Sequence, residues 1–392
     1  MRLLAGTALA ALLAGPALAE LTFEEAADLT EALWADYAER YAAETAAELE
    51  AEAIESASHR LRFRIVQFSE GVGQPCAAPC ESPTGEAQPL FISMHGGGGT
   101  TPEVNDRQWQ NQIELGAAYA PREGLYLAPR APTDTWDCWH SAAVDPLLER
   151  LIRALVAAGT VDPDRVYLMG YSAGGDGVYA LSPRMADRFA AASMMAGHPN
   201  GISLAGVRNL PFSIQVGALD TAYDRAAVAR QYGEMLDALE AADPGGYEHF
   251  TEIHDGKGHW MDGEDRIAVP WMEGFAREAQ PDRIVWRQQG VVYARFYWLA
   301  VPPDEAVIGD EIAAERDGQT ITLSGPPGRT VLVRLNDDMA DLDAPVTILA
   351  EDGTVLHEGL VERSAATIEE TIEDYGDPAA VYSAEIAVAL PE

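Results

Sequence analysis

The feature that most constrains this chain is a serine held between glycines directly after an apolar run. The run 166–169 (Val-Tyr-Leu-Met) is typical of a buried strand, 170–174 (Gly-Tyr-Ser-Ala-Gly) follows it, and the next residues suit a helix. A strand that turns this tightly into a helix needs glycine on both flanks and presents the serine Oγ beyond the end of the strand. The motif therefore predicts Ser172 as a nucleophile, favoured by the amides of a helix N-terminus. The alternative is a Gly-rich turn that holds an ordinary serine.

The surrounding 220 or so residues, from 59 to 280, alternate short apolar runs with helical patterns. Such alternation predicts a doubly wound, mostly parallel sheet that helices cover on both faces, which is an α/β fold. The strand-like runs are 61–66, 90–94, 124–128, 166–169, 189–195, 212–216 and 247–253, and helical patterns occupy 144–157, the stretch after Gly174, 225–241 and 269–279.

The helices stop after about residue 281, and seven short strand-like runs follow, with a Glu351-Asp352-Gly353 turn between two of them. This pattern predicts a small β-rich, sandwich-like C-terminal domain over 281–392, with one helix near 367–374. Before the α/β domain, residues 20–58 are rich in Ala, Glu and Leu at helical spacing and predict an N-terminal helical segment.

The first 19 residues have the parts of a secretory signal peptide: a short basic start, an apolar run from Leu3 to Leu13, and an Ala17-Leu18-Ala19 end. They predict export to the periplasm or beyond. No later apolar run is long enough to cross a membrane, so no membrane association is expected after cleavage. Because the chain carries 26 basic and 63 acidic residues, a net charge of −37, it should repel phosphate backbones and not bind nucleic acid.

Export would allow a disulfide among the three cysteines, Cys76, Cys80 and Cys138. The first two are spaced for a small loop closure, but Cys138 is an equal candidate partner, and one thiol is left over in either pairing. A fourth ligand at a familiar spacing is missing, so no metal site is predicted.

A glycine-rich loop follows the strand-like run 90–94: His95-Gly96-Gly97-Gly98-Gly99. Tetrahedral intermediates of acyl transfer need amide donors for the oxyanion, and glycines let the backbone approach that closely. The predicted donors are the amide of Ala173 and one amide from Gly97 or Gly98. A phosphate-binding loop is the alternative, but no Gly-Lys-Ser/Thr follows. His95 is predicted to be a structural residue of this loop.

A nucleophilic serine needs a base, and the base needs an acid that orients it. With an elbow of this kind, the acid and then the histidine follow the serine along the chain. Asp220 comes directly after the run 212–216 and is predicted as the acid, with Asp224 as its rival. His259 lies in a Gly-flanked loop after the run 247–253 and is predicted as the base. The other candidate histidines lie on or beside a strand or precede the acid: His140, His198, His249 and His254.

Four tryptophans are predicted to line a substrate cleft, because they fall in or near loops at this edge: Trp109, Trp136, Trp139 and Trp260. The alternative for each is a core anchor. Asp176, Arg130 and Arg107 are further candidates for contact with a polar substrate, against the alternative of solvated or ion-paired side chains.

The segments 95–99, 170–175, 217–220 and 258–259 together resemble the α/β-hydrolase superfamily. Within it, the chain is most similar to the secreted polyhydroxybutyrate depolymerase and feruloyl esterase-like branch, over about residues 60–278. The resemblance implies an α/β-hydrolase catalytic domain over 59–280 and an exported carboxylic-ester hydrolase. It further implies a small or polymeric ester as substrate, and neither a metal nor an organic cofactor.

Two other functions stay open at this point. Prolyl-oligopeptidase-type serine peptidases share the fold and the elbow, although this chain has no N-terminal region of propeller length. A binding protein that kept the fold without catalysis is the other, with the C-terminal domain as its docking module. The acyl and alcohol groups of the substrate and the oligomeric state are not predicted.

Overall fold

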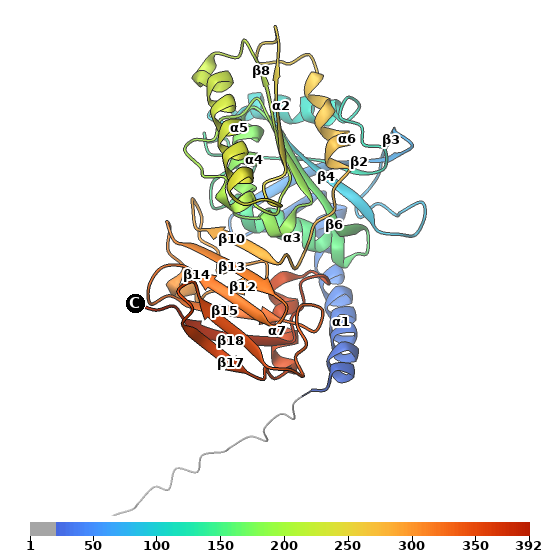
Figure 1. The fold of residues 1–392 in the computed structure, drawn as a ribbon. Helices are drawn as coiled ribbons and strands as arrows, with labels where there is room; N and C mark the ends of the chain where they lie inside the picture. The colour runs from blue at the N-terminus through green and yellow to red at the C-terminus, as the bar shows by residue number, and fades with distance from the viewer. Residues whose placement is uncertain (1–20) are drawn as a thin grey trace, which may run out of the picture.

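A computed structural model describes residues 21–392, and it is built around one sheet of nine strands (Figure 1). The strand order is β1-β2-β5-β4-β6-β7-β8-β9, with β3 paired to β2. Strands β1 to β3 pair antiparallel, whereas β5 onward in that order pair parallel. The strands are β1 Ala53–Ser56, β2 His59–Ser69, β3 Val72–Pro75, β4 Gln88–Met94, β5 Gly124–Arg130, β6 Val161–Tyr171, β7 Ala191–Met195, β8 Phe212–Gly217 and β9 His249–His254.

Helices cover both faces of this sheet, and alternate strand residues point to each face. Leu90 and Ile92 of β4 share a core with α3, α4 and α5, whereas Phe91 packs in a second core with α2 and α6. The helices are α2 Pro102–Leu115, α3 Val144–Ala157, α4 Ala173–Leu181, α5 Arg225–Ala242 and α6 Ala268–Met272. The predicted doubly wound, mostly parallel α/β sheet is confirmed.

The N-terminal helix α1, Phe23–Glu50, begins at a capping box in which Thr22 and Glu25 bond to each other's backbone amides. It runs first along α7 of the C-terminal region and then along α3, and so contacts both parts of the chain (Figure 1). The sequence predicted a helical segment over 20–58, but the helix ends at Glu50. Residues 53–56 form β1 because Ile54 is fully buried against the sheet, where it pairs with Leu61.

The C-terminal region contains two further sheets, in the orders β10-β13-β14-β16-β17 and β11-β12-β15-β18. Their inward residues, such as Leu323 and Val333, alternate with more exposed ones and join a single core. The elements are β10 Arg283–Arg287, β11 Arg295–Phe296, β12 Leu299–Ala300, β13 Glu311–Asp317, β14 Thr320–Ser324, β15 Thr330–Leu335, β16 Val346–Ala350, β17 Val355–Gly359, α7 Ala365–Tyr375 and β18 Ala384–Ala389. Short 3₁₀ turns lie at Ala186–Arg188 (η1), Ala205–Val207 (η2), Ala222–Asp224 (η3), Glu264–Ile267 (η4) and Pro303–Glu305 (η5).

The β-rich region meets the sheet at the amino ends of three parallel strands. Arg277, just before this region, bonds both to Asp164 at the start of β6 and to Asp377. Arg295 binds Asp187 just before β7, and Asn209, just before β8, donates to the carbonyl of Arg283. These contacts lie at the edge of the sheet opposite the one that carries Ser172.

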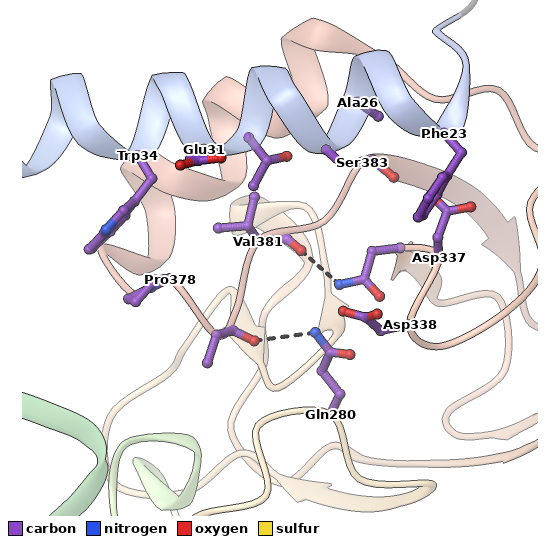
Figure 2. A pocket seen from close by; sticks show the side chains of 14 residues that line it. Phe23, Ala26, Glu31, Trp34, Gln280, Asp337, Asp338, Pro378, Val381 and Ser383 are labelled. Atoms are coloured by element: carbon purple, nitrogen blue, oxygen red, sulfur yellow. Dashed lines mark hydrogen bonds between the residues drawn. The ribbon is translucent and has the colours of Figure 1, made fainter.

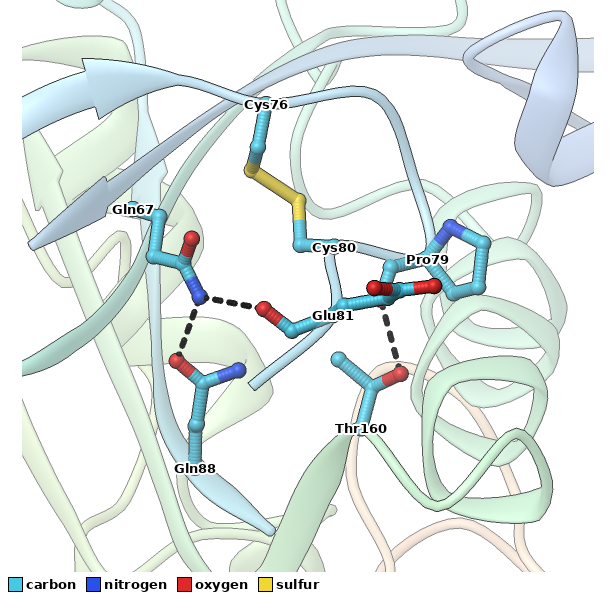
Figure 3. Close-up of a disulfide and its surroundings, with 7 residues drawn as sticks. All are labelled: Gln67, Cys76, Pro79, Cys80, Glu81, Gln88 and Thr160. Carbon is cyan, nitrogen blue, oxygen red and sulfur yellow. Dashed lines mark hydrogen bonds between the residues drawn. A yellow bond between two sulfur atoms is a disulfide. The ribbon is translucent and has the colours of Figure 1, made fainter. Parts of the chain in front are cut away.

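Cys76 and Cys80 form the disulfide, which closes the loop between β3 and β4 (Figure 3). The loop is also held by Thr160, whose hydroxyl donates to the carbonyl of Pro79 (2.7 Å), and by Gln67, whose amide donates to that of Glu81 (2.9 Å). Cys138 is a buried free thiol, and burial raises its pKa to about 12. The pairing that the sequence left open is therefore Cys76 with Cys80.

A cavity of about 440 Å³ lies between α1 and the C-terminal region (Figure 2). Its wall includes Trp34 of α1, and Gln280 and Asn336, which donate to the carbonyls of Ala379 and Val381. It lies away from Ser172. Within residues 21–392, no helix has the length and the apolar character to span a bilayer.

Candidate active site

Ser172 occupies the sharp turn between β6 and α4, with φ 58° and ψ −117°. The two flanking glycines make this turn possible. A Cβ on Gly170 would lie 2.3 Å from the carbonyl oxygen of Gly174, and one on Gly174 would lie 2.2 Å from that of Met94. A backbone strained in this way costs roughly 1–3 kcal/mol and is held by its surroundings. The Gly-x-Ser-x-Gly motif thus has a steric cause in this fold.

The three side chains predicted to act together do lie together. Asp220 follows β8 and His259 follows β9, so both reach the carboxyl edge of the sheet where Ser172 stands. His259 Nδ1 lies 2.6 Å from Asp220 Oδ2, and its Nε2 lies 3.1 Å from Ser172 Oγ. The carboxylate can only accept, so Nδ1–H donates to it and Nε2 is left to accept the Ser172 hydroxyl proton.

The loops after β8 and β9 are locked to each other, which fixes this geometry. The amide of Leu219 donates to the carbonyl of Lys257 (2.7 Å), and a Cβ on Gly217 would lie 2.1 Å from the carbonyl oxygen of Gly258. Asp220 is 3% exposed, whereas the His259 side chain is 39% exposed. The acid is therefore shielded from water, while a bound substrate can reach the base.

The rivals of these residues are placed elsewhere. Asp224 is exposed on a left-handed turn at the start of α5. His254 is buried with its Nε2 2.9 Å from Gln215 Oε1, and His249 pairs with Asp237. His198 Nδ1 contacts Asn200, and His140 is half-buried, which lowers its pKa. None of these histidines contacts Ser172 within the described part of the chain.

His95 is a structural residue of the glycine loop. Its Nδ1–H donates to the carbonyl of Gly96 (2.5 Å), and its Nε2 accepts from the amide of Ala131 (3.1 Å). Burial lowers the pKa of His95 to about 4, against the opposing effect of the bond to Gly96. The ring is therefore neutral and ties the loop after β4 to the end of β5.

The two glycines predicted as oxyanion donors differ. The amide of Gly98 donates to Asn105 Oδ1 (2.9 Å), so it is not available to a substrate, which corrects that alternative. No described residue accepts a hydrogen bond from the amide of Gly97, whose φ of 107° requires glycine. Ala173 is the first residue of α4, so its amide has no partner within the helix. The amides of Gly97 and Ala173 thus have no partner among the described residues.

Of the four tryptophans predicted to line a cleft, two lie at the site. Trp136 is 51% exposed and its ring lies 5.8 Å from that of Tyr223, while Trp260 is 48% exposed and packs edge-on against Tyr171 at 5.7 Å. Tyr171, which is not among the predicted site residues, donates from its hydroxyl to the carbonyl of His259 (2.8 Å). Its position in the sequence, directly before Ser172 in the Gly-x-Ser motif, could have indicated that it lies at the site.

The prediction is wrong for the other two tryptophans, which are core anchors. Trp109 on α2 is buried and donates to the carbonyl of Ala128 (3.0 Å). Trp139 is fully buried and donates to the carbonyl of His95 (2.8 Å), so it supports the glycine loop from below. In both, the ring is buried in the core while the indole N–H still finds a carbonyl partner, which is the usual arrangement of a buried tryptophan.

Two of the candidate polar contacts are structural, and the third shows no contact with the site. Asp176 is buried in the first turn of α4 and accepts from the amide of His198 (2.7 Å); burial raises its pKa. Arg130 is buried and pairs with Asp106 and Asp134. Arg107 is exposed. Within residues 21–392, no group of three His, Cys, Asp or Glu side chains is arranged to hold a metal ion.

No family model matches the chain. NocK, a candidate esterase of Nocardia uniformis subsp. tsuyamanensis, is 31% identical over 124 residues, which are 31% of this chain and 36% of NocK. The chain thus spans about a third of the length of that curated relative.

Solved structures with a similar fold are named as esterases and serine hydrolases. One is a thermostable esterase, with a TM-score of 0.42 and 18% identity over 58% of this chain and 64% of that one. Another is a phospholipase/carboxylesterase from Dyadobacter fermentans, with a TM-score of 0.39 and 14% identity over 56% and 99%. A third is the fluorophosphonate-binding serine hydrolase FphF of Staphylococcus aureus, with a TM-score of 0.36 and 13% identity over 56% and 96%. Similarities at this level do not assign a reaction to this chain.

Proposed function

We propose that this protein is a serine hydrolase that cleaves carboxylic esters through an acyl-enzyme on Ser172. The observation that carries the proposal is the relay of two hydrogen bonds, 2.6 Å from Asp220 to His259 and 3.1 Å from His259 to Ser172. Ser172 lies at the strained turn between β6 and α4, and the amides of Gly97 and Ala173 have no partner among the described residues. A nucleophile, a base, an orienting acid and an oxyanion site are the four parts that acyl transfer needs.

In the proposed reaction, His259 Nε2 takes the hydroxyl proton as Ser172 Oγ bonds to the ester carbonyl carbon. The amides of Gly97 and Ala173 hold the oxyanion of the tetrahedral intermediate. The carbon–oxygen bond to the alcohol then breaks, and the alcohol leaves with the proton from His259. Water, deprotonated by His259, attacks the acyl-enzyme in the same way, and the carboxylic acid leaves while the proton returns to Ser172. Asp220 holds the imidazole in the required tautomer throughout.

The rim of the site supports an apolar or aromatic group on the substrate. Trp136 with Tyr223 and Trp260 with Tyr171 are two aromatic pairs in the loops around Ser172. The local similarity to NocK favours an ester over a peptide bond. A feruloyl or hydroxybutyrate ester, as the resemblance of the sequence implies, is the finer form of this proposal.

Fluorophosphonate labelling with a panel of p-nitrophenyl, feruloyl and hydroxybutyrate esters and matched amides tests the proposal. Wild type should be labelled on Ser172 and turn over esters faster than amides. Ser172→Ala should lose both properties, whereas Ser58→Ala, an exposed serine in the turn before β2, should keep them. Faster cleavage of amides would favour a peptidase, and a folded wild type without labelling would favour a binding protein.

We also propose that the chain is exported with removal of residues 1–19, which lie outside the described residues. The Cys76–Cys80 disulfide supports this because such bonds persist in oxidising compartments. Protein recovered from the periplasm or medium should begin at Glu20 by mass; full-length protein confined to the cytoplasm would contradict it.

A further inference from the structure

Arg225 differs from every other buried arginine of the described chain. Seven buried arginines donate hydrogen bonds from their guanidinium groups to carboxylates or main-chain carbonyls: Arg130, Arg184, Arg188, Arg277, Arg295, Arg334 and Arg363. The guanidinium of Arg225 makes none with any described residue, and its Nε is buried without a partner. It is 7% exposed.

Two groups hold Arg225 in place. It is the first residue of α5, and its Nη1 lies 3.7 Å from Asp220 Oδ1, an ion pair too long for a hydrogen bond. Its Cζ lies 4.9 Å from the centre of the Tyr223 ring. The turn from Asp220 to Arg225 is closed by the amide of Ala226, which donates to the carbonyl of Asp220 (3.1 Å).

Burying a guanidinium without hydrogen bonds costs several kcal/mol, which the ion pair and the aromatic contact offset only in part. The carboxylate that it faces is the one that orients His259. Asp220 thus lies between two nitrogen donors: its Oδ2 accepts from the imidazole, and its Oδ1 faces the guanidinium.

We propose that Arg225 is a positioning residue that acts through Asp220. Its charge keeps Oδ1 turned away from His259, so that Oδ2 is the oxygen that bonds to the imidazole. The same charge repels a positive charge on the imidazole across the carboxylate, so we expect its removal to change the pH dependence of the reaction. The inference rests on the proposed function, because it takes His259 as the base.

The other titratable groups around Asp220 and Arg225 are His259, Tyr171, Asp265 and Asp176. His259 faces Ser172, Asp220 and the Tyr171 ring at 5.3 Å. Burial raises the pKa of the Tyr171 phenol. Asp265, which accepts from the hydroxyl of Tyr119, and Asp220 add to this shift, whereas Arg225 opposes it. Arg225 also favours the ionised form of Asp176, whose pKa burial raises. Arg225 is therefore the cation that acts on this group of carboxylates from α5.

The test compares Arg225→Met, which keeps the length of the side chain without its charge, with Arg225→Lys, which keeps a charge. The midpoint of the acid limb of kcat/KM should move upward by about 0.5–1 pH unit in Arg225→Met. It should stay near the wild-type value in Arg225→Lys. Arg230→Gln is the matched control, because it removes a charge from an exposed position of the same helix. The value of kcat should fall in Arg225→Met on the order of tenfold, since Asp220 is held less firmly.

A second readout separates this inference from the proposed function. The His259 imidazole, assigned with His259→Gln, is titrated by NMR in wild type and in both Arg225 variants, and this needs no substrate. The same upward shift in Arg225→Met alone supports the role of Arg225 even if no ester is cleaved. Equal midpoints in the folded Met and Lys variants, with lower thermal stability as the sole change, would leave Arg225 a packing residue and overturn the proposal.

Discussion

The carboxyl edge of the sheet and the junction with the β-rich region both bury charged side chains, but they bond them differently. At the junction, Arg277 bonds to Asp164, to Asp377 and to the carbonyl of Asp187, and Glu149 contacts both Arg188 and Arg295. At the carboxyl edge, one hydrogen bond joins Asp220 to His259 and one joins His259 to Ser172.

The difference separates charges that hold the structure from charges to which we assign a role in the proposed reaction. A buried ion is stable when all its donors or acceptors are bonded, and the junction meets that condition with several partners for each group. In the relay that we propose to be catalytic, the Ser172 hydroxyl can still form a hydrogen bond, and so can the amides of Gly97 and Ala173, where a substrate would bind in the proposed reaction. Arg225 is buried like the charged groups of the junction, but its guanidinium lacks the hydrogen bonds that those groups make.

The largest effect is expected from removing the Asp220 carboxylate, which accepts the hydrogen bond from His259. Asp220→Asn should lower kcat by a factor on the order of 10⁴, because the amide favours the wrong imidazole tautomer. The free energy of unfolding should also fall, because the buried Arg225 loses the carboxylate that it faces, although backbone bonds still hold the turn at residue 220. Steady-state kinetics on the best ester, with urea unfolding, measures both effects.

Asp224→Asn is the control for that variant, because Asp224 is exposed four residues farther along the same turn. It should retain wild-type turnover within about twofold. Similar losses in the two variants would mean that the turn as a whole, and not the Asp220 carboxylate, supports His259.

The junction should respond in the opposite way. Arg277→Met leaves Asp164 and Asp377 without their main partner and should lower the free energy of unfolding by about 3–5 kcal/mol. The turnover of the folded enzyme at low temperature should be unchanged. Arg287→Gln, which breaks an exposed pair with Glu311, should cost less than about 1 kcal/mol. A loss of kcat in folded Arg277→Met would show that the two edges of the sheet are coupled.

The smallest expected effect is a pH dependence at the junction. Burial alone would raise the pKa of Glu149, but Arg188, Arg295 and Arg153 outweigh it and lower the pKa to about 2. Because the folded pKa lies below the ordinary value of 4.5, Glu149 contributes stability above about pH 4.5, and this contribution is lost as the pH falls toward 2.

Urea unfolding of wild type and Glu149→Gln at pH 6 and pH 3 measures this contribution. The advantage of wild type should shrink by about 2 kcal/mol between the two pH values. An advantage that stays constant would mean that Glu149 stabilises the junction by shape and hydrogen bonding and not by its charge.

Much of the site is predictable because local sequence dictates local structure there. The elbow at Ser172 needs glycine at positions 170 and 174 for steric reasons, and the residues after β8 and β9 must emerge at the same edge of a parallel sheet. That is why Asp220 and His259 are predictable from their places after strands.

The tertiary structure decided what depends on contacts between distant segments. Trp109 and Trp139 look like Trp136 and Trp260 in sequence, but the first two fill the core and the other two remain exposed. The motif does not distinguish Gly97 from Gly98. In the folded chain, Asn105, seven residues beyond Gly98, accepts a hydrogen bond from the amide of Gly98.

The sequence by itself determined the sheet, its elbow and the order of the three side chains proposed to react, since steric and periodic constraints act over a few neighbouring residues. Only the tertiary structure decided which edge meets the β-rich region, which cysteine pairs with Cys76, and that Arg225 faces Asp220. Burial, pairing and charge proximity depend on distances between segments that are far apart in the chain, and folding alone sets those distances.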